Sequence, residues 1–538
     1  LEKEIFKHLF PIATRTLIKE LKLCKDELEG VTEQEKYNFF LVNFLNNDNY
    51  IIELFDFYPL LLRCLLDKIV SIIEFFNNLN FNWQNDKNTI SKEMKLSCLT
   101  IKQIEIVGDF HNGNVATTKI SLNDGNALFY KPHSLATAKM YYSILNDLYA
   151  EYGFSTLEYP IIDRVEYGWE MGIKYKTCQS KYEIQRFYIR LGIQIMLNYL
   201  LDIQDLHYEN LIAYGEHPVF IDIEIMCGNI KKYHNNLTAK EMAEFLLSSS
   251  VLGSGILPYP NTSNSIFCSL IGKGGIKTNR KVVKIINSMS STIHLSYTYA
   301  VTRDQLNRPS IKNMVCKYSN FVENIIQGFA WAYRYIERNS FMLENKISFA
   351  FSRLLLKNTQ SYSKMLQISY EPIFLTDGGE RQLILSKYYN DVTNEDKAIF
   401  QSELSALLKG DIPYFSCWNN DKKLYLNKTG EYISNYLYIT PDKYLKMRLN
   451  SLCENDYKFQ SNLLCNALNL ERKCFYPELL KNIALKREGI VCNVLKSCEM
   501  IGDYLINIAI KNYNFTDAIW IENKKEVGIS LSNMYLYD

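Results

Sequence analysis

The sequence predicts an α+β fold in which a small antiparallel sheet follows a helical N-terminal region and precedes a longer, mainly helical remainder. Three observations favour this class. Apolar residues recur at helical spacing before residue 90, β-type segments joined by a hairpin turn occupy residues 100–131, and a long amphipathic helix follows. With 538 residues, 47% of them hydrophobic and 22% charged, the chain can form about two to four packing units of an ordinary globular protein.

The first two regions are predicted from residue spacing and turn chemistry. Leucine, isoleucine and aromatic residues between Ile51 and Leu65 recur every three or four positions, as on one face of a helix. Asn123-Asp124-Gly125-Asn126 is typical of a hairpin turn between two strands. Antiparallel strands are therefore expected at Thr100–Val107, Val115–Leu122 and Leu128–Tyr130.

The rest of the chain is expected to be mainly helical, with a few short strands. Helices are predicted at Ser134–Tyr149 and Glu183–Leu201, with strand-like pieces near Arg164–Val165 and Trp169–Ile173. Two apolar segments, Leu211–Ala213 and Val219–Ile223, flank a turn. Three regions follow from these elements: helical at 1–98, sheet-bearing at 99–177, and helical at 178–538.

Charge and composition exclude several classes of function. Sixty Lys and Arg against 59 Asp and Glu give a net charge of +1, so general attraction to nucleic acid is not expected. No apolar run reaches the roughly 18–20 residues of a membrane span. The charged start at Leu1–Glu4 is unlike a signal peptide and lacks an initiator Met, and the 13 cysteines contain no Cys-x-x-Cys pair. We expect a piece of a longer cytoplasmic protein with reduced thiols.

Four features in chain order supply what phosphoryl transfer requires. They are a glycine-bearing turn at 108–114, Lys131 at a strand end, Asp205 with Asn210 after a long helix, and Asp222 in an apolar segment. A glycine turn can cover phosphates, a lysine on the adjoining strand can contact them, and an Asp can orient the attacking hydroxyl. An Asn and a second Asp can hold Mg²⁺ through oxygen atoms. The Asp-x-His-x-x-Asn spacing is closer to lipid kinases than to protein kinases.

Taken singly, each feature has a plainer explanation. Asp205 and Asn210 are also typical of a turn after a helix, and a lysine at a strand end is usually a solvated charge. Asp222 is harder to dismiss, because a carboxylate within an apolar strand should be partly buried and then requires a partner. The order and spacing of the four features together favour a kinase-like site.

At these residues the chain resembles the dehydratase region of class II lanthipeptide synthetases, the LanM type. The matching motifs span most of the chain and form a specific set. They are Gly108-Asp109-Phe110-His111-Asn112-x-Asn114-Val115, Tyr130-Lys131-Pro132, Tyr167-Gly168-Trp169-Glu170, Arg190-Leu191-Gly192, Asp205-x-His207-x-Glu209-Asn210, Asp222-Ile223-Glu224, Ser250-Val251-Leu252, Gly255-Ile256-Leu257-Pro258, Gly328-Phe329, Arg353 with Thr359 and Tyr362, and Gly410-Asp411-Ile412-Pro413-Tyr414-Phe415.

The resemblance implies a two-lobed, lipid-kinase-like fold with an extra helical region, and a cytoplasmic enzyme that uses ATP and Mg²⁺. Such enzymes phosphorylate Ser and Thr of a ribosomal precursor peptide and then eliminate phosphate, leaving dehydroalanine or dehydrobutyrine; a leader segment is recognised away from the chemistry. The implied site residues are Lys131, Asp205 and His207 for phosphoryl transfer, Asn210 and Asp222 for the metal, Gly108, Gly113, Lys131 and Glu224 for the nucleotide, and Asp109, His111, Arg353 and Thr359 for elimination. His207 is expected mainly to support the catalytic loop.

Two positions depart from the family pattern. His133 follows Tyr-Lys-Pro where the family usually has Arg, and the helix at Ser134–Tyr149 contains no Glu to pair with Lys131. Asp147 or Glu170 could serve instead. Full-length members continue into a zinc-dependent cyclase domain, which is expected to be a partner region missing from this chain, and zinc is expected only there.

Three functions are compared. The first is a peptide dehydratase acting by phosphorylation and elimination, favoured by Arg353, Thr359 and the turn with Asp109 and His111. The second is a kinase of a peptide, lipid or small molecule that keeps its phosphorylated product. The third is a peptide-binding module without catalysis, which would not require Lys131 together with the acidic residues.

Overall fold

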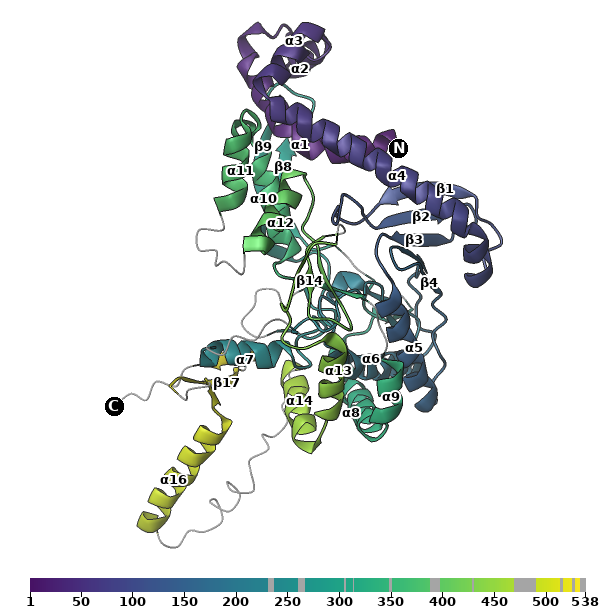
Figure 1. The fold of residues 1–538 in the computed structure, drawn as a ribbon, viewed down its shortest axis with the longest axis vertical. Helices are drawn as coiled ribbons and strands as arrows, with labels where there is room; N and C mark the ends of the chain where they lie inside the picture. The colour runs from purple at the N-terminus through teal and green to yellow at the C-terminus, as the bar shows by residue number, and fades with distance from the viewer. Residues whose placement is uncertain are drawn as a thin grey trace.

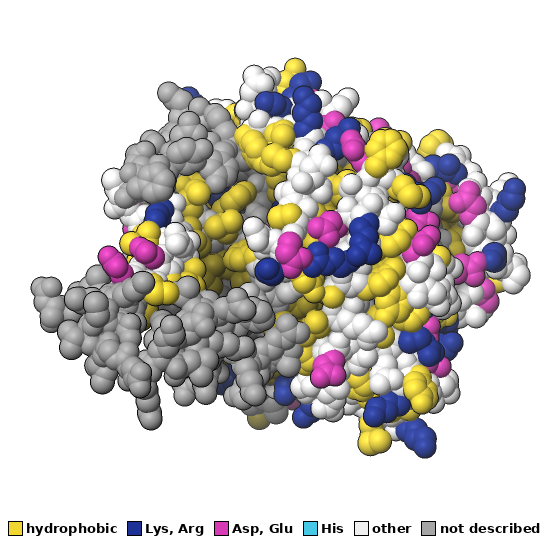
Figure 2. Space-filling view, turned by 90° about the horizontal axis from the view of Figure 1, so that it is seen from below, with side chains coloured by type: hydrophobic (Ala, Val, Ile, Leu, Met, Phe, Trp, Pro, Cys, Tyr) yellow, Lys and Arg dark blue, Asp and Glu magenta, His cyan; other side chains and the backbone are white. Residues whose placement is uncertain are grey.

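The computed structural model describes residues 1–230, 237–259, 267–303, 306–312, 314–347, 351–387, 397–427, 430–468, 490–512, 516–524 and 528–532. It is a mixed α+β protein with several small antiparallel sheets (Figure 1). None of the helices within these ranges is both long and apolar enough to cross a bilayer. On the face shown in Figure 2, basic and acidic side chains are interspersed among apolar and neutral ones.

The N-terminal region is helical, as predicted. Thr32 caps the second helix, since its side chain accepts the Glu35 amide while the Glu35 carboxylate accepts the Thr32 amide. Pro59 begins the fourth helix, where its missing amide hydrogen costs nothing. The four helices are α1 (Glu2–Leu23), α2 (Glu33–Asn43), α3 (Asp48–Phe57) and α4 (Pro59–Glu93).

A five-stranded antiparallel sheet follows, in the order β1-β2-β3-β5-β4. The predicted hairpin turn is confirmed, because Ile120 pairs with Leu128 and Ser121 with Ala127 on either side of it. The strand predicted at Arg164–Val165 is wrong: Val165 has a φ of 69°, which no strand residue adopts, and the strand lies just before it. The strands are β1 (Ile101–Ile106), β2 (Thr118–Leu122), β3 (Ala127–Lys131), β4 (Ile161–Asp163) and β5 (Gly168–Met171).

Helix α4 belongs to two hydrophobic cores at once. Its first turns, including Leu61 and Cys64, pack against helices from residues 359–408. Its later turns, including Phe75 and Trp83, cover one face of the five-stranded sheet (Figure 1). Asp86 on the same helix accepts hydrogen bonds from the ring nitrogen of Trp169 and the hydroxyl of Tyr167, each at 2.9 Å, so α4 also holds the motif that ends at Glu170.

The largest core lies in the C-terminal part, around the buried helix α6. Helices α6 and α8 contact each other closely at Gly192 and Gly328. The helices of this part are α5 (Ala136–Glu151), α6 (Lys181–Leu201), α7 (Ala239–Ser248), α8 (Val322–Arg338), α9 (Ser340–Lys346), α10 (Thr359–Ser369), α11 (Gly378–Ser386), α12 (Lys397–Leu408), α13 (Pro441–Asn450), α14 (Glu454–Ala467) and α16 (Ile490–Ile508).

The C-terminal part also contains more strands than the sequence predicted. The expected hairpin after α6 is present, and a four-stranded sheet and a long hairpin were not anticipated, because their strands are short or lack regular alternation. The strands are β6 (Leu211–Tyr214), β7 (His217–Phe220), β8 (Lys277–Ile286), β9 (His294–Val301), β10 (Ser310–Ile311), β11 (Met314–Val315), β12 (Phe351–Leu354), β13 (Phe415–Trp418), β14 (Leu424–Tyr425), β15 (Tyr432–Ile433), β16 (Ile510–Lys511), β17 (Ala518–Lys524) and β18 (Gly528–Ser532).

Candidate active site

Lys131, at the end of β3, lies between two carboxylates. Its Nζ is 2.6 Å from Asp222 Oδ1, beyond the end of β7, and 3.6 Å from Glu170 Oε1 on β5. Glu170 lies opposite Phe129 in the β3–β5 ladder, so its side chain shares a face with Lys131. The carboxylate partner left open by the sequence is thus Glu170. Asp147 pairs with Lys346 instead.

Burial and neighbouring charges shift the pKa values of Lys131 and Glu170 in opposite directions. Burial would lower the pKa of Lys131, but the carboxylates of Asp222 and Glu170 raise it above its ordinary value, so Lys131 is a cation. Burial raises the pKa of Glu170 to about 7, and Lys131 only partly offsets that effect. A small pocket beside Lys131 is also lined by His133, Glu170 and Asp222.

Asp205 and Asn210 lie in the loop that follows α6. Asp205 adopts a left-handed conformation with a φ of 64°, and its carbonyl oxygen accepts a hydrogen bond from Asn210 Nδ2 at 2.9 Å. This bond uses the amide nitrogen of Asn210 and leaves its oxygen available as a ligand. Desolvation by the surrounding protein raises the pKa of Asp205; His207 opposes this, whereas the carboxylates of Asp222 and Glu224 add to it. Asp205 therefore lies close enough to both carboxylates for their negative charge to affect its pKa.

His207 is held by the backbone of the same loop. Its amide donates to Asp205 O at 3.0 Å, its carbonyl accepts the Asn210 amide at 3.0 Å, and it forms an isolated bridge with Cys268. Within the described part of the chain, its buried Nδ1 has no hydrogen-bond partner. These backbone contacts fit the expected role of a loop support, which stays a prediction.

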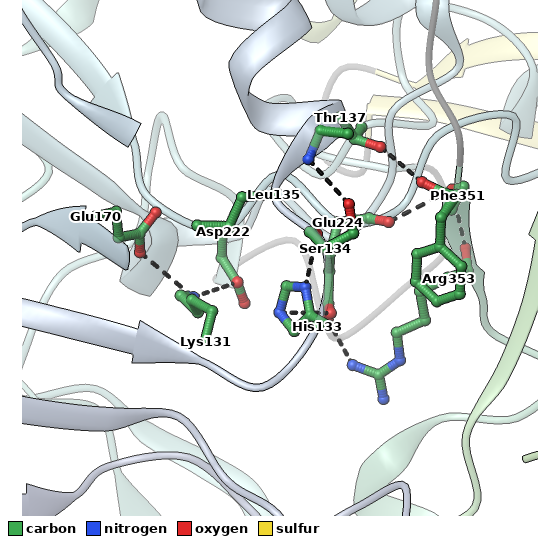
Figure 3. A network of polar contacts seen from close by, with 12 residues as sticks. Lys131, His133, Ser134, Leu135, Thr137, Glu170, Asp222, Glu224, Phe351 and Arg353 are labelled. Atoms are coloured by element: carbon green, nitrogen blue, oxygen red, sulfur yellow. Dashed lines mark hydrogen bonds and ion pairs between the residues drawn. The ribbon is translucent and has the colours of Figure 1, made fainter. Parts of the chain in front are cut away.

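Glu224 joins the Asp222 segment to the residues expected to act in elimination. Its carboxylate pairs with the guanidinium of Arg353 on β12, and its Oε2 lies 3.5 Å from His133 Nε2 (Figure 3). Burial alone would raise the pKa of Glu224, but Arg353, His133 and Lys131 together lower it to about 2. The position where an arginine was expected is thus occupied by His133, whose ring nitrogen lies beside the Glu224 carboxylate.

The glycine turn at 108–114 is held by contacts with the segment around Asp411 and Tyr414. Gly113 N donates to Asp411 Oδ2 at 2.8 Å, so this amide, expected to contact a nucleotide, binds an internal carboxylate here. His111 stacks on the ring of Tyr414, with centroids 5.2 Å apart. The neighbouring Asp109 is exposed. At Gly108, an added Cβ would lie 3.1 Å from the Thr117 side chain, so the close approach of this strand favours glycine.

Among the described contacts, none links Thr359 to the other expected site residues. It begins α10 just after the capping residue Asn358 and is partly exposed. Arg353, by contrast, is 7% exposed and lies 5.0 Å from the Tyr414 ring. Sequence reasoning missed the contact of His133 with Glu224 and the contacts of Tyr414 with His111 and Arg353. Their only signal was position, one after Lys131-Pro132 and the other in the motif around Asp411.

The acidic residues suit a divalent cation held jointly with phosphates. Among the described residues, no set of three or more His, Cys, Asp or Glu side chains is arranged to hold a metal alone. Mg²⁺ is commonly bound by one or two protein oxygen ligands together with substrate phosphates. Asn210 and Asp222 could supply such ligands, and the nearby Asp205 and Glu224 add negative charge.

The chain is similar to a described protein family and to a lacticin 481/lactococcin biosynthesis protein. A family model described as "Domain of unknown function (DUF4135)" matches residues 58–417, from the start of α4 to β13. The chain is 25% identical over 535 residues to the Lacticin 481/lactococcin biosynthesis protein LcnDR2 of Lactococcus lactis subsp. lactis. That match covers 95% of this chain and 56% of the relative, so the chain spans about half of the relative's length. The family match covers more than half of the residues, and the chain therefore belongs to the DUF4135 family.

Proposed function

We propose that this chain is an ATP-dependent peptide dehydratase of lanthipeptide biosynthesis. The observation that carries the proposal is the Lys131–Asp222 and Glu224–Arg353 pairing, which joins the phosphoryl-transfer residues to an arginine from a distant strand. The similarity to a lacticin 481/lactococcin biosynthesis protein supports a modified peptide as the product. The substrate would be a ribosomal precursor peptide, and the use of ATP would place the reaction in the cytoplasm.

In the proposed arrangement, residues 99–177 and 178–538 act as the two lobes of a lipid-kinase-like fold, and residues 1–98 add helices to it. Lys131 at the end of β3 would contact ATP phosphates, and Glu170 would orient it. Asn210 and Asp222 would hold Mg²⁺, which neutralises phosphate charge when bound. Helix α4 packs on the sheet, which would make the added helices part of the first lobe's support.

The first half-reaction would transfer the γ-phosphoryl group to a peptide hydroxyl. Asp205 lies in the loop where a catalytic carboxylate would accept the hydroxyl proton as the oxygen attacks phosphorus. Burial raises the pKa of Asp205 above its ordinary value, which makes its carboxylate a better proton acceptor. The products would be ADP and a phosphoserine or phosphothreonine peptide.

The second half-reaction would remove that phosphate. A base takes the Cα proton, the electron pair forms the Cα–Cβ double bond, and the Cβ–O bond breaks to release inorganic phosphate. Arg353 suits the leaving group, because its planar guanidinium can bind two phosphate oxygens and its Nε has no partner among the described residues. His111, stacked on the same Tyr414 ring as Arg353, is a candidate for proton transfer.

One experiment separates this function from its alternatives. The protein would be incubated with ATP, Mg²⁺ and the precursor peptide encoded nearby, and the peptide mass recorded. Loss of water supports the dehydratase, and gain of phosphate without loss supports a kinase that keeps its product. An unchanged peptide that still binds supports a binding module.

A further inference from the structure

A buried lysine on α4 connects the helical N-terminal region to the glycine turn. Lys68 is 6% exposed, and its Nζ donates to Asn114 Oδ1 at 2.6 Å and to Gly410 O at 3.2 Å. The same Nζ lies 4.5 Å from the centroid of the Phe110 ring. Lys68 therefore contacts both ends of the turn and the segment that packs against it.

Asp411 binds the turn from the other side. Its Oδ2 accepts hydrogen bonds from Gly113 N at 2.8 Å and Asn114 N at 3.1 Å. Three successive residues of the turn have left-handed φ angles, 53° at Asn112, 92° at Gly113 and 59° at Asn114. Successive amides in such a conformation form a concave anion site, which the Asp411 carboxylate fills here. Because asparagine adopts this conformation at a cost, the turn depends on such external partners.

The segment that begins at Asp411 also fixes two residues of the proposed elimination step. Ile412 N donates to Phe110 O at 3.1 Å, which joins this segment to the turn directly. Tyr414, two residues later, stacks on His111 with an interplanar angle of 22°, and its ring lies 5.0 Å from the Arg353 guanidinium carbon. A shift of the turn would therefore move His111 relative to the Tyr414 ring that Arg353 contacts.

We infer that Lys68 and Asp411 are positioning residues for phosphate elimination: they lock the glycine turn so that His111 stays stacked on the Tyr414 ring, which Arg353 also contacts. This inference rests on the proposed function. The Gly113 and Asn114 amides bind the Asp411 carboxylate and not a nucleotide phosphate in this arrangement. The turn is therefore proposed to serve the elimination step. It also gives α4 a role in the site, although no residue of α4 was expected there.

The test measures the two half-reactions separately in Lys68→Met and Asp411→Asn. Elimination is followed with a synthetic precursor peptide carrying phosphoserine, and phosphorylation with the unmodified peptide and ATP. We expect the kcat of elimination to fall by ~10-fold or more with KM nearly unchanged, because small displacements of catalytic groups are costly. Phosphorylation should stay close to the parent rate. Lys87→Met, an exposed lysine on the same helix, is the matched control and should leave both steps unchanged.

A second measurement is independent of turnover. Hydrogen exchange at the Gly113 and Asn114 amides should be faster in Asp411→Asn than in the parent, and Lys68→Arg should restore more elimination than Lys68→Met. If the parent does not eliminate phosphate, both the proposed function and this inference fall. If the parent eliminates and both variants match it, or if both half-reactions fall equally, only the inference is overturned.

Discussion

Arg353 is bound to Glu224 through both side chain and backbone. The guanidinium pairs with the Glu224 carboxylate, and Arg353 N donates to Glu224 O at 3.0 Å, so β12 lies directly beside the segment that carries Asp222. The residue expected to assist phosphate departure is thereby attached two positions from the expected metal ligand. Under the proposed function, this proximity would let one peptide position be phosphorylated and then lose its phosphate without leaving the protein.

Replacing Arg353 should separate the two half-reactions. In Arg353→Ala, elimination from a phosphoserine peptide should fall by ~10²–10³, since a donor to the developing charge is lost. Phosphorylated peptide should then accumulate in the complete reaction, as recorded by mass spectrometry. Arg63→Ala, at an exposed arginine of α4, is the control. Elimination at the parental rate by Arg353→Ala would show that this arginine only holds Glu224.

Replacing Asp222 should stop the reaction at its first step. Asp222→Asn removes the negative charge closest to Lys131 and replaces a proposed carboxylate ligand of Mg²⁺ by a neutral, weaker amide ligand, while keeping the side-chain size. We expect neither phosphorylated nor dehydrated peptide, and a weaker dependence of nucleotide binding on Mg²⁺ measured by calorimetry. Normal dehydration by this variant would be incompatible with the metal assignment.

Replacing Asp205 tests the proposed general base. Asp205→Asn keeps the loop geometry, because Asn210 bonds to the backbone carbonyl of residue 205 and not to its side chain. The ATP-dependent step should fall by ~10² or more, while ATP binding persists. Elimination from a phosphoserine peptide should be much less affected. A variant that phosphorylates the unmodified peptide normally would refute the role.

The sequence predicted the local elements better than the contacts between them. The hairpin before Lys131 and the long helix before Asp205 follow from turn chemistry and helical spacing, and both are confirmed. The pairing of Glu170 with Lys131 depends on strand register, which the sequence does not specify. Lys68 and Asp411 bind the same turn although they lie 343 positions apart (411 minus 68), and no local pattern specifies such a contact. Short strands such as β12 were missed, since their pairing with distant partners outweighs a weak local preference.

The pH dependence of stability should reveal the unusual environment of Glu170. Its pKa is about 7 in the folded protein against an ordinary 4.5, so the folded state binds this proton more tightly than the unfolded state. The free energy of unfolding should therefore fall, by about 3 kcal/mol from this group, as pH rises from about 4.5 to about 7. Urea unfolding of the parent and Glu170→Gln at several pH values measures the difference. Parallel curves for the two proteins would show that the pKa of Glu170 is the same in the folded and unfolded states.

The close crossing of α6 and α8 gives a test of the fold that is independent of chemistry. A Cβ added to Gly192 would lie 2.0 Å from Ile325 O, and one added to Gly328 would lie 2.0 Å from Ile189 O. Both contacts are with backbone, which cannot rotate away, so the helices would have to separate. This explains why glycines occur in the motifs Arg190-Leu191-Gly192 and Gly328-Phe329, although glycine is a poor helix former.

Gly192→Ala should therefore lower the free energy of unfolding by about 1–3 kcal/mol, the usual cost of overpacking a core. Helix propensity alone predicts the opposite sign, a gain of up to ~1 kcal/mol. Gly378→Ala at the start of α11, where nothing lies within 4 Å of an added Cβ, is the control and should change stability by less than ~0.5 kcal/mol. Denaturant unfolding of the three proteins decides between the two signs, and a stabilised Gly192→Ala would mean that α6 and α8 do not meet at this residue.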